Sequence, residues 1–400
     1  MNYCLVHQLH VCNNLTLLVT NYIIMGMKVY LDNAATTKMS REVKKAMLPF
    51  FDTIYGNQSS SHSFGMEANF YVQQAREQFA TVLNCKTNEI YFTSSGSESN
   101  SWAIVGLAMA NKEKGNHIIT SKIEHDSILN ACAYLENLGF KVTYLDVNEL
   151  GEVNLEQLEK AITPQTILIS IMMANNEVGT KQDIKKISQI AHDKNIIFHT
   201  DAVQTFGLEK IDVNEMGIDA LSASSHKIYG PKGMGLLYLK SGIKIDNLIF
   251  GGNQEFGKRG GTLNTAGVVG FAKATEISYK NLEKTQKYLK NLQNYLIFRL
   301  KNEFSNKIEI NGNPQNCMPQ IVSVSFLNQD ANILLIELDQ AKIAVSRGSA
   351  CTAGSNLPSY VLQAMGKQKQ ANSTIRFSLG KYTRKKDIDY VIKVLKNIIK

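Results

Sequence analysis

Short apolar runs alternate with segments of helical periodicity along most of the chain. From residue 28 onward, runs of strand length are followed by stretches in which apolar residues recur every three or four positions. The runs predict strands at 89–93, 118–120, 142–145, 167–172, 196–199 and 236–239, with a further apolar strand just before Lys227. The periodic segments predict helices at 70–83, 97–111, 155–162 and 183–193. Such alternation indicates the α/β class, a mostly parallel sheet covered by helices.

The pattern changes after residue 265. A long helical stretch, 265–304, is followed by shorter strands at 321–326, 343–346 and 374–378 and by a few helices. A chain of 400 residues has room for two domains, so we expect a second, smaller α+β domain here.

The first 26 residues contain no Lys, Arg, Asp or Glu. A secretory signal needs a basic start and a mitochondrial presequence needs arginines, and the apolar run is too short to span a bilayer. We therefore expect residues 1–26 to be a disordered or misassigned extension, with the natural start at Met25 or Met27.

The formal net charge of +8 raises the hypothesis of nucleic-acid binding. However, residues 381–400 hold seven Lys/Arg and two Asp, so they supply +5 of this charge. The same residues show the periodicity of an amphipathic helix, which favours a terminal helix with one packed and one solvated face. A docking site for an acidic partner is the alternative. We expect no direct nucleic-acid binding and no membrane association.

Six cysteines without a CxxC pair do not form a disulfide scaffold, so a cytoplasmic protein with reduced cysteines is expected. Cys85 and Cys132 lie in helical patterns, where packing is the expected role. Cys351 differs, because nine of the ten residues at 346–355 are Gly, Ala, Ser, Thr or Cys. A segment of such small side chains has little to pack and is expected to move, which suits a thiol that must reach a substrate.

Several residues at predicted strand ends match the needs of a pyridoxal-phosphate site. Lys227 lies among small and hydroxylic residues, where a lysine can act as a Schiff-base nucleophile. Asp201 follows a strand and could hold the proton on the pyridine nitrogen. The segment 93–100, with Gly96 and Ser97, joins a strand to a helix and could bind the phosphate. His125 could stack on a flat cofactor and move protons.

Two further groups complete the set. Asn176 also follows a strand, where an amide can bond a ring hydroxyl or cap a turn. Arg376 projects from a short strand, and its guanidinium fork suits a substrate carboxylate. The sequence shows no P-loop and no dinucleotide fingerprint. It also shows no HExxH motif, and we expect no metal site.

With these residues assembled, the chain from about residue 29 onward resembles the cysteine desulfurases of the NifS/IscS group, within the fold-type I pyridoxal-phosphate enzymes. The resemblance rests on YLDNAATT at 30–37, GNQSSSH at 56–62, NNEVG at 175–179, SSHKIYGPKG at 224–233, RGGT at 259–262 and GSACT at 348–352. The family usually has Pro, Thr and Ser where this chain has Gln58, Ser97 and Gly260. None of these departures removes a group that the reaction requires.

The resemblance implies a large cofactor-binding domain at 38–265, with a mostly parallel seven-stranded sheet. It implies a small domain formed by 28–37 and 266–400, with the cysteine loop. Lys227 would form the Schiff base, Asp201 would pair with the pyridine nitrogen, and His125 would assist proton transfer. The remaining cofactor contacts would come from Gln204, Asn176, Gly96, Ser97, Ser224, His226 and, across a homodimer, Thr262.

The implied activity is removal of sulfur from L-cysteine, with Arg376 and Asn176 binding the substrate. Cys351 would take the sulfur as a persulfide, and L-alanine would leave. The sulfur would pass to an acceptor protein such as an iron–sulfur scaffold, or to tRNA thiolation. Two alternatives stay open, a selenocysteine lyase or another class V aminotransferase-like enzyme, and a non-enzymatic dimer partner. Cys351 argues against another aminotransferase-like activity, while Lys227, Asp201 and His125 argue against an idle protein.

Overall fold

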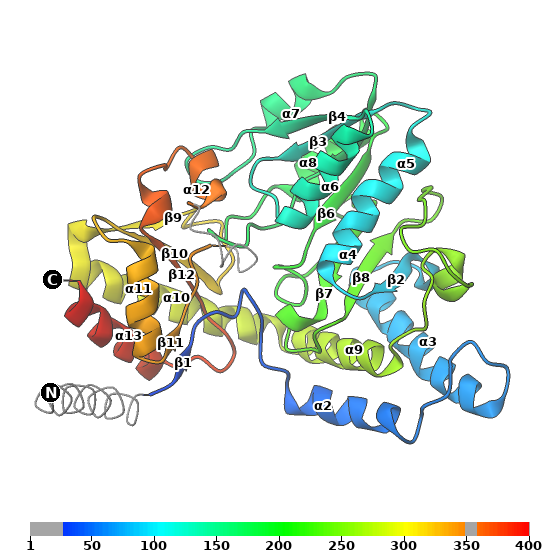
Figure 1. Cartoon of the computed structure of the whole chain (residues 1–400), viewed down its shortest axis with the longest axis horizontal. Helices are drawn as coiled ribbons and strands as arrows, with labels where there is room; N and C mark the ends of the chain where they lie inside the picture. Colours follow the sequence, from blue (N-terminus) through cyan, green and yellow to red (C-terminus); the bar gives the residue numbers. More distant parts are fainter. Residues whose placement is uncertain (1–26, 349–357, 400) are drawn as a thin grey trace, which may run out of the picture.

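A seven-stranded sheet forms the centre of the larger part of the molecule (Figure 1). The computed structural model describes residues 27–348 and 358–399, so the expected extension at 1–26 and Cys351 lie outside the described residues. The strand order is β2-β8-β7-β6-β5-β3-β4, and β8 runs antiparallel to both of its neighbours. The strands are β2 Ile90–Thr93, β3 His117–Ser121, β4 Lys141–Leu145, β5 Thr166–Ser170, β6 Ile197–Asp201, β7 Ala220–Ser224 and β8 Gly235–Leu239. The prediction of a mostly parallel seven-stranded sheet is confirmed.

Helices connect and cover these strands. The helices of this part are α2 Arg41–Met47, α3 Ser63–Leu83, α4 Gly96–Ser101, α5 Leu107–Asn111, α6 Asp126–Asn137, α7 Leu155–Ala161, α8 Ile184–His192 and α9 Thr265–Lys280. In α8 the buried residues Ile184, Ile187 and Ala191 recur at helical spacing, and Asp183 caps the first turn by accepting from Lys186 N. The helices expected at 155–162 and 183–193 are thus confirmed to within a residue or two.

The helix expected at 97–111 contains a π-helical turn, Trp102–Gly106, between α4 and α5. Trp102 Nε1 donates to Asp246 O at 2.9 Å, and a Cβ added to Gly106 would lie 2.7 Å from the same oxygen. The wider turn therefore fits against a loop that is about 140 residues away in sequence. The local pattern carries no signal for such a contact.

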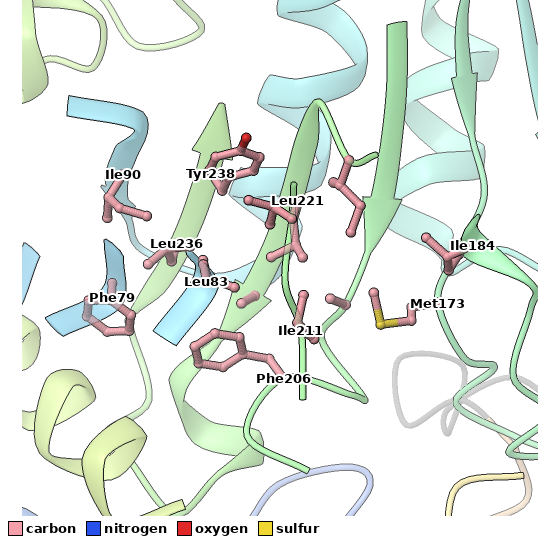
Figure 2. Packing of buried hydrophobic residues seen from close by; sticks show 14 of the residues in the cluster. Phe79, Leu83, Ile90, Met173, Ile184, Phe206, Ile211, Leu221, Leu236 and Tyr238 are labelled. Atoms are coloured by element: carbon pink, nitrogen blue, oxygen red, sulfur yellow. The ribbon is translucent and has the colours of Figure 1, made fainter. Parts of the chain in front are cut away.

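The main core lies between this sheet and the helices α3 and α9 (Figure 2). Phe79 and Leu83 of α3, Phe206, and Leu221 and Leu236 of the sheet are fully or almost fully buried in one cluster. The rings of Phe79 and Phe206 are 6.2 Å apart. Contrary to the expectation, Cys85 lies outside a helix, because α3 ends at Leu83 and Asn84 adopts a left-handed conformation.

A second core lies around a three-stranded antiparallel sheet, β12-β10-β9, at the left in Figure 1. Its elements are α10 Leu282–Phe304, β9 Ile308–Asn311, β10 Ile321–Phe326, α11 Ala331–Gln340, β11 Ile343–Ala344, β12 Thr374–Ser378 and α13 Lys385–Ile398. Helix α12 Tyr360–Ala364 packs in a separate cluster with Ile123, Met172 and Val178. The expected helical stretch 265–304 is two helices, because the backbone leaves the helical conformation at Asn281.

The amino-terminal strand β1 Val29–Tyr30 pairs in parallel with β11, and Val29 and Leu31 belong to the second cluster. This pairing supports our proposal that 28–37 joins 266–400 in a small domain and that 38–265 forms a large one. Residues of α9 beyond 265, such as Phe271, pack in the first cluster. The packing of the large part therefore extends past the proposed boundary.

The basic carboxyl-terminal helix α13 packs one face and exposes the other, as the periodicity predicts. Ile388, Val391, Ile392 and Leu395 are buried, and Lys396 forms a 2.7 Å ion pair with Glu303 of α10. Within the described ranges, no helix combines the length and the apolar character that a membrane crossing needs.

Candidate active site

A cavity of about 160 Å³ lies where β2, β3, β5, β6 and β7 end. In open α/β sheets, ligands bind beyond the carboxyl ends of the strands, and this cavity has that position. Ten of the twelve residues predicted for the site line it. These are Gly96, Ser97, His125, Asn176, Asp201, Gln204, Ser224, His226, Lys227 and Arg376.

Lys227 ends a short 3₁₀ turn, Ser225–Lys227, that follows β7. Its Nζ donates to the carbonyl oxygens of Ala34 and Ala35, the latter at 2.8 Å. The turn itself is held by Thr37, whose Oγ1 donates to His226 O and accepts from Tyr229 N. The Lys227 amine thus lies in the cavity, where it is hydrogen-bonded to two backbone carbonyls of the segment just after β1.

Asp201, the last residue of β6, presents a buried carboxylate to the cavity. Its Oδ2 accepts from Asn100 Nδ2 at 2.6 Å, and its Oδ1 accepts from Val203 N at 2.8 Å. Two donors on two different oxygens fix the plane of the carboxylate. A fixed carboxylate of this kind can hold a proton on a ring nitrogen.

His125 is the N-cap of α6, and its ring orientation is set by Ser127. Ser127 N donates to Nδ1 at 3.1 Å, and Ser127 Oγ lies 2.9 Å from the same nitrogen. Because Nδ1 accepts a backbone N–H, the neutral ring carries its proton on Nε2. The neutral imidazole is therefore a hydrogen-bond donor at Nε2 and could release a proton there only as imidazolium.

His226 and Ser224 lie at the end of β7, opposite the start of α4. Burial, followed by the charges of Lys227 and Lys232, lowers the pKa of His226 to about 4. Its Nδ1 lies 3.1 Å from Thr36 Oγ1. At neutral pH the ring is uncharged, so it can bind an anion only through a hydrogen bond.

Arg376 of β12 is 2% exposed and brings the second sheet to the cavity. One terminal nitrogen donates to Asn176 O and the other to Asp32 Oδ1, each at 2.9 Å. Its Nε is buried without a hydrogen-bond partner in the described part of the chain. A planar guanidinium held at two points is well oriented to bind a carboxylate.

The cavity fits pyridoxal phosphate. Buried oxygens of Asn100, Asn176 and Ser224 have no hydrogen-bond partner among the described residues, and a buried polar atom without a partner is costly. Gln204 Nε2 donates to Ala34 O at 3.1 Å, which holds this amide at the wall. A Cβ at Gly96 would lie 2.6 Å from Val203 Cγ2, so only glycine fits at the start of α4. These features are those expected of a preformed site for a polar, planar ligand.

Two predicted site residues are not among those that line the cavity. Thr262 is exposed and lies just after Gly261, outside the cavity. Arg259, three residues earlier, forms a 2.8 Å ion pair with Glu98 of α4, which ties this segment to the predicted phosphate-binding helix. Cys351 lies outside the described residues, so its role stays a prediction.

The sequence interpretation missed four groups that hold the side chains of the cavity in place. Asn100 holds Asp201, and its position one helical turn after Gly96 is a signal that could have identified it. Asp32 holds Arg376, while the carbonyls of Ala34 and Ala35 hold Lys227. Backbone carbonyls leave no trace in a residue pattern.

Glu124, next to His125, is a fully buried acid. Its Oε1 accepts from Ser121 Oγ at 2.7 Å and from Met172 N at 3.0 Å. Burial raises the pKa of this carboxyl from its ordinary value of 4.5 to about 8, with the charge of Asp201 adding to the effect. At neutral pH a protonated, uncharged Glu124 therefore lies beside the cavity.

We expect Glu124→Gln to change how stability depends on pH. Between about pH 4.5 and 8 the folded wild type binds a proton that the unfolded chain has lost, so its free energy of unfolding falls as pH rises, by up to about 1.4 kcal/mol per pH unit. The variant lacks this group, so its stability relative to the wild type should rise across the same window. Urea unfolding of both proteins at several pH values measures the difference, with the exposed Glu156→Gln as control. A difference that stays constant with pH would contradict a raised pKa for Glu124.

Comparison with known proteins agrees with this architecture. The aminotransferase class-V family model matches residues 29–391. A cysteine desulfurase IscS of Clostridium botulinum is 49% identical over 380 residues, covering 94% of this chain and 95% of the relative. A cysteine desulfurase IscS of Dictyoglomus turgidum is 46% identical, with the same coverage.

Solved structures give the same result. A NifS-like protein superposes with a TM-score of 0.88 at 38% identity, covering 93% of this chain and 99% of the other. SspA in complex with cysteine superposes with a TM-score of 0.79 at 39% identity, covering 90% of this chain and all of the other.

The fold and the cavity thus define a fold-type I pyridoxal-phosphate enzyme. The chain belongs to the aminotransferase class-V family and, within it, to the cysteine desulfurases.

Proposed function

We propose that this enzyme removes sulfur from L-cysteine, giving L-alanine and a persulfide on Cys351. The observation that carries the proposal is the convergence of Lys227, Asp201, His125 and Arg376 on one cavity. The cysteine bound in the relative SspA supports the choice of substrate.

The predicted residues would hold the cofactor as follows. Lys227 binds it covalently through Nζ, Asp201 holds the proton of its ring nitrogen, and His125 covers the ring. Gln204 and Asn176 bond its ring oxygen or the substrate. The phosphate is bound by the hydrogen-bond donors of Gly96, Ser97, Ser224 and His226, with Thr262 from the partner subunit. When bound, pyridoxal phosphate supplies an electron sink for the substrate's α-carbon.

The chain's own groups then perform the reaction. Arg376 binds the carboxylate of L-cysteine, and Lys227 Nζ takes the proton from Cα. The Cys351 thiolate attacks the substrate sulfur, so an S–S bond forms while the C–S bond breaks. The carbon skeleton takes up protons, for which Lys227 Nζ, carrying the proton from Cα, and His125 as imidazolium are the donors at the cavity, and leaves as L-alanine. No external oxidant is needed, because the electron pair of the broken C–S bond stays with the carbon skeleton, which is reduced as the sulfur becomes persulfide sulfur.

The direct test is to incubate the holoenzyme with L-cysteine and a reducing thiol and to measure sulfide and alanine together. Equal amounts of the two products are expected. Formation of pyruvate and ammonia in place of alanine would contradict the proposal.

We expect Arg376→Lys to weaken substrate binding. Lysine keeps the positive charge but cannot bond Asn176 O, Asp32 and a carboxylate with one planar fork. Loss of a charged hydrogen bond corresponds to a rise in KM for L-cysteine of about 10- to 100-fold, with the bound cofactor retained. Steady-state kinetics measure this change, and an unchanged KM would remove Arg376 from the substrate site.

A homodimer completes the proposed site, because Thr262 is exposed and outside the chain's own cavity. Exposed apolar residues near α3 support such an interface. Phe51, Tyr55, Phe64, Met66 and Phe70 are each more than half exposed. Sedimentation velocity should give the mass of two chains, and the mass of one chain would contradict the dimer.

The proposed destination of the sulfur is an acceptor protein, such as an iron–sulfur scaffold, in the cytoplasm. The IscS name of the relatives fits this choice, and tRNA thiolation is the alternative. Transfer of ³⁵S from labelled Cys351 to a purified scaffold would test it, and retention of the label on the enzyme would count against it.

A further inference from the structure

Glu177 is a buried acid at the turn that follows β5, and its position is fixed by its neighbour. Asn175 Oδ1 accepts from Glu177 N at 2.8 Å and from Val178 N at 3.0 Å. Asn175 Nδ2 in turn donates to Ile123 O at 2.9 Å. Glu177 is 4% exposed. The hydrogen bonds to Asn175 fix the turn from which its side chain projects.

The carboxylate of Glu177 lies directly against the backbone at Gly348. A Cβ added to Gly348 would lie 2.8 Å from Glu177 Oε2 and 3.1 Å from Oε1. Gly348 also has a φ of +124°, which favours glycine. Two residues earlier, Ser346 exchanges backbone hydrogen bonds with Arg376, so the chain runs from the substrate-binding arginine to Glu177.

The same carboxylate binds Ser359. Ser359 Oγ donates to Glu177 Oε2 at 2.6 Å, and it also caps α12 by accepting from Leu362 N at 3.2 Å. The next residue, Tyr360, donates from its hydroxyl to Glu124 O at 2.6 Å, beside His125. A hydrogen bond to a buried carboxylate is among the stronger polar contacts in a protein.

Gly348 and Ser359 are the two ends of the segment that contains Cys351, and ten residues separate them. We infer that Glu177 is a positioning residue that hydrogen-bonds one end of this segment at Ser359 and lies against the other at Gly348, next to Asn176 of the cavity wall. The inference rests on the proposed role of Cys351 as sulfur acceptor. Ten residues span about 30 Å when extended, so anchoring the ends beside the cavity would limit the distance of Cys351 from it and raise the effective concentration of the thiol there.

Ser359→Asp separates this role from the capping of α12. Aspartate is a good N-cap, but its carboxylate would repel Glu177 instead of donating to it. Loss of a charged hydrogen bond predicts about tenfold faster alkylation of Cys351 by iodoacetamide in the resting holoenzyme and about tenfold slower persulfide formation. The change in cofactor absorbance on adding L-cysteine should stay the same, because the cavity is intact.

Four further variants control the experiment. Ser359→Thr keeps both the cap and the donor and should behave as the wild type. Glu177→Gln weakens the contact without adding charge, so it should shift both rates in the same direction, whereas the exposed Glu156→Gln should not. Adding Glu177→Gln to Ser359→Asp supplies an amide donor for the new carboxylate and should recover part of the loss.

Wild-type alkylation and persulfide rates in both Ser359→Asp and Glu177→Gln would overturn the inference. Peptide mass spectrometry assigns the alkylation to Cys351. The failure of the proposed function would look different, since Cys351→Ala would then still form alanine, whatever the Glu177 variants do.

Discussion

Lys227→Ala protein is expected to lack covalently bound cofactor and to form no measurable alanine from L-cysteine. Lys227 combines two roles in the proposed reaction, because the same Nζ attaches the cofactor and moves the Cα proton. Alanine can do neither, so we expect a loss of activity of at least about 10⁴-fold. Reduction of the holoenzyme with borohydride, followed by mass spectrometry, shows whether the cofactor is attached and to which lysine.

Lys232→Ala is the matched control. This lysine is exposed and lies five residues further along the same glycine-containing loop. It is not among the residues that line the main cavity, so its removal should leave both the reduced adduct and alanine formation in place. A reduced adduct that persists in Lys227→Ala would place the covalent attachment on another residue.

The position of Lys227 shows why most of the site could be predicted from sequence. Parallel strands end at a common edge, so polar residues directly after apolar runs converge there, as Asp201, Asn176 and His125 do. These three assignments needed only the ends of predicted strands and the chemistry of one side chain each, whereas Gln204, Ser224 and His226 were expected only from the family resemblance. The same reasoning predicts the fold class, because the alternation of strand and helix is local.

The features that were missed depend on contacts distant in sequence. The Lys227 ammonium is held by backbone carbonyls of Ala34 and Ala35, about 190 residues away. Asp32 reaches Arg376 across 344 positions. The π-helical turn at 102–106 likewise depends on Asp246. Only tertiary packing creates these relations, so periodicity and local propensity do not contain them.

Cys351→Ala protein is expected to keep its bound cofactor and to lose alanine formation from L-cysteine by at least about 10³-fold, because it lacks the nucleophile that takes the sulfur. Other thiols are poor substitutes, since the thiolate is the reactive form. Burial raises the pKa of the Cys85 thiol and of the Cys132 thiol, each to about 12. Both therefore stay protonated at neutral pH.

Two comparisons sharpen this test. Cys351→Ser keeps a side chain of similar size that cannot form a persulfide, so it should fail as completely as alanine. Cys317→Ala removes a half-buried thiol that contacts Gln293, and it should retain activity. Alkylation after a single turnover, read by peptide mass spectrometry, should find the added sulfur on Cys351 in the wild type. Wild-type alanine formation by Cys351→Ala would assign the sulfur to another acceptor, because the cofactor site alone would then suffice for C–S cleavage.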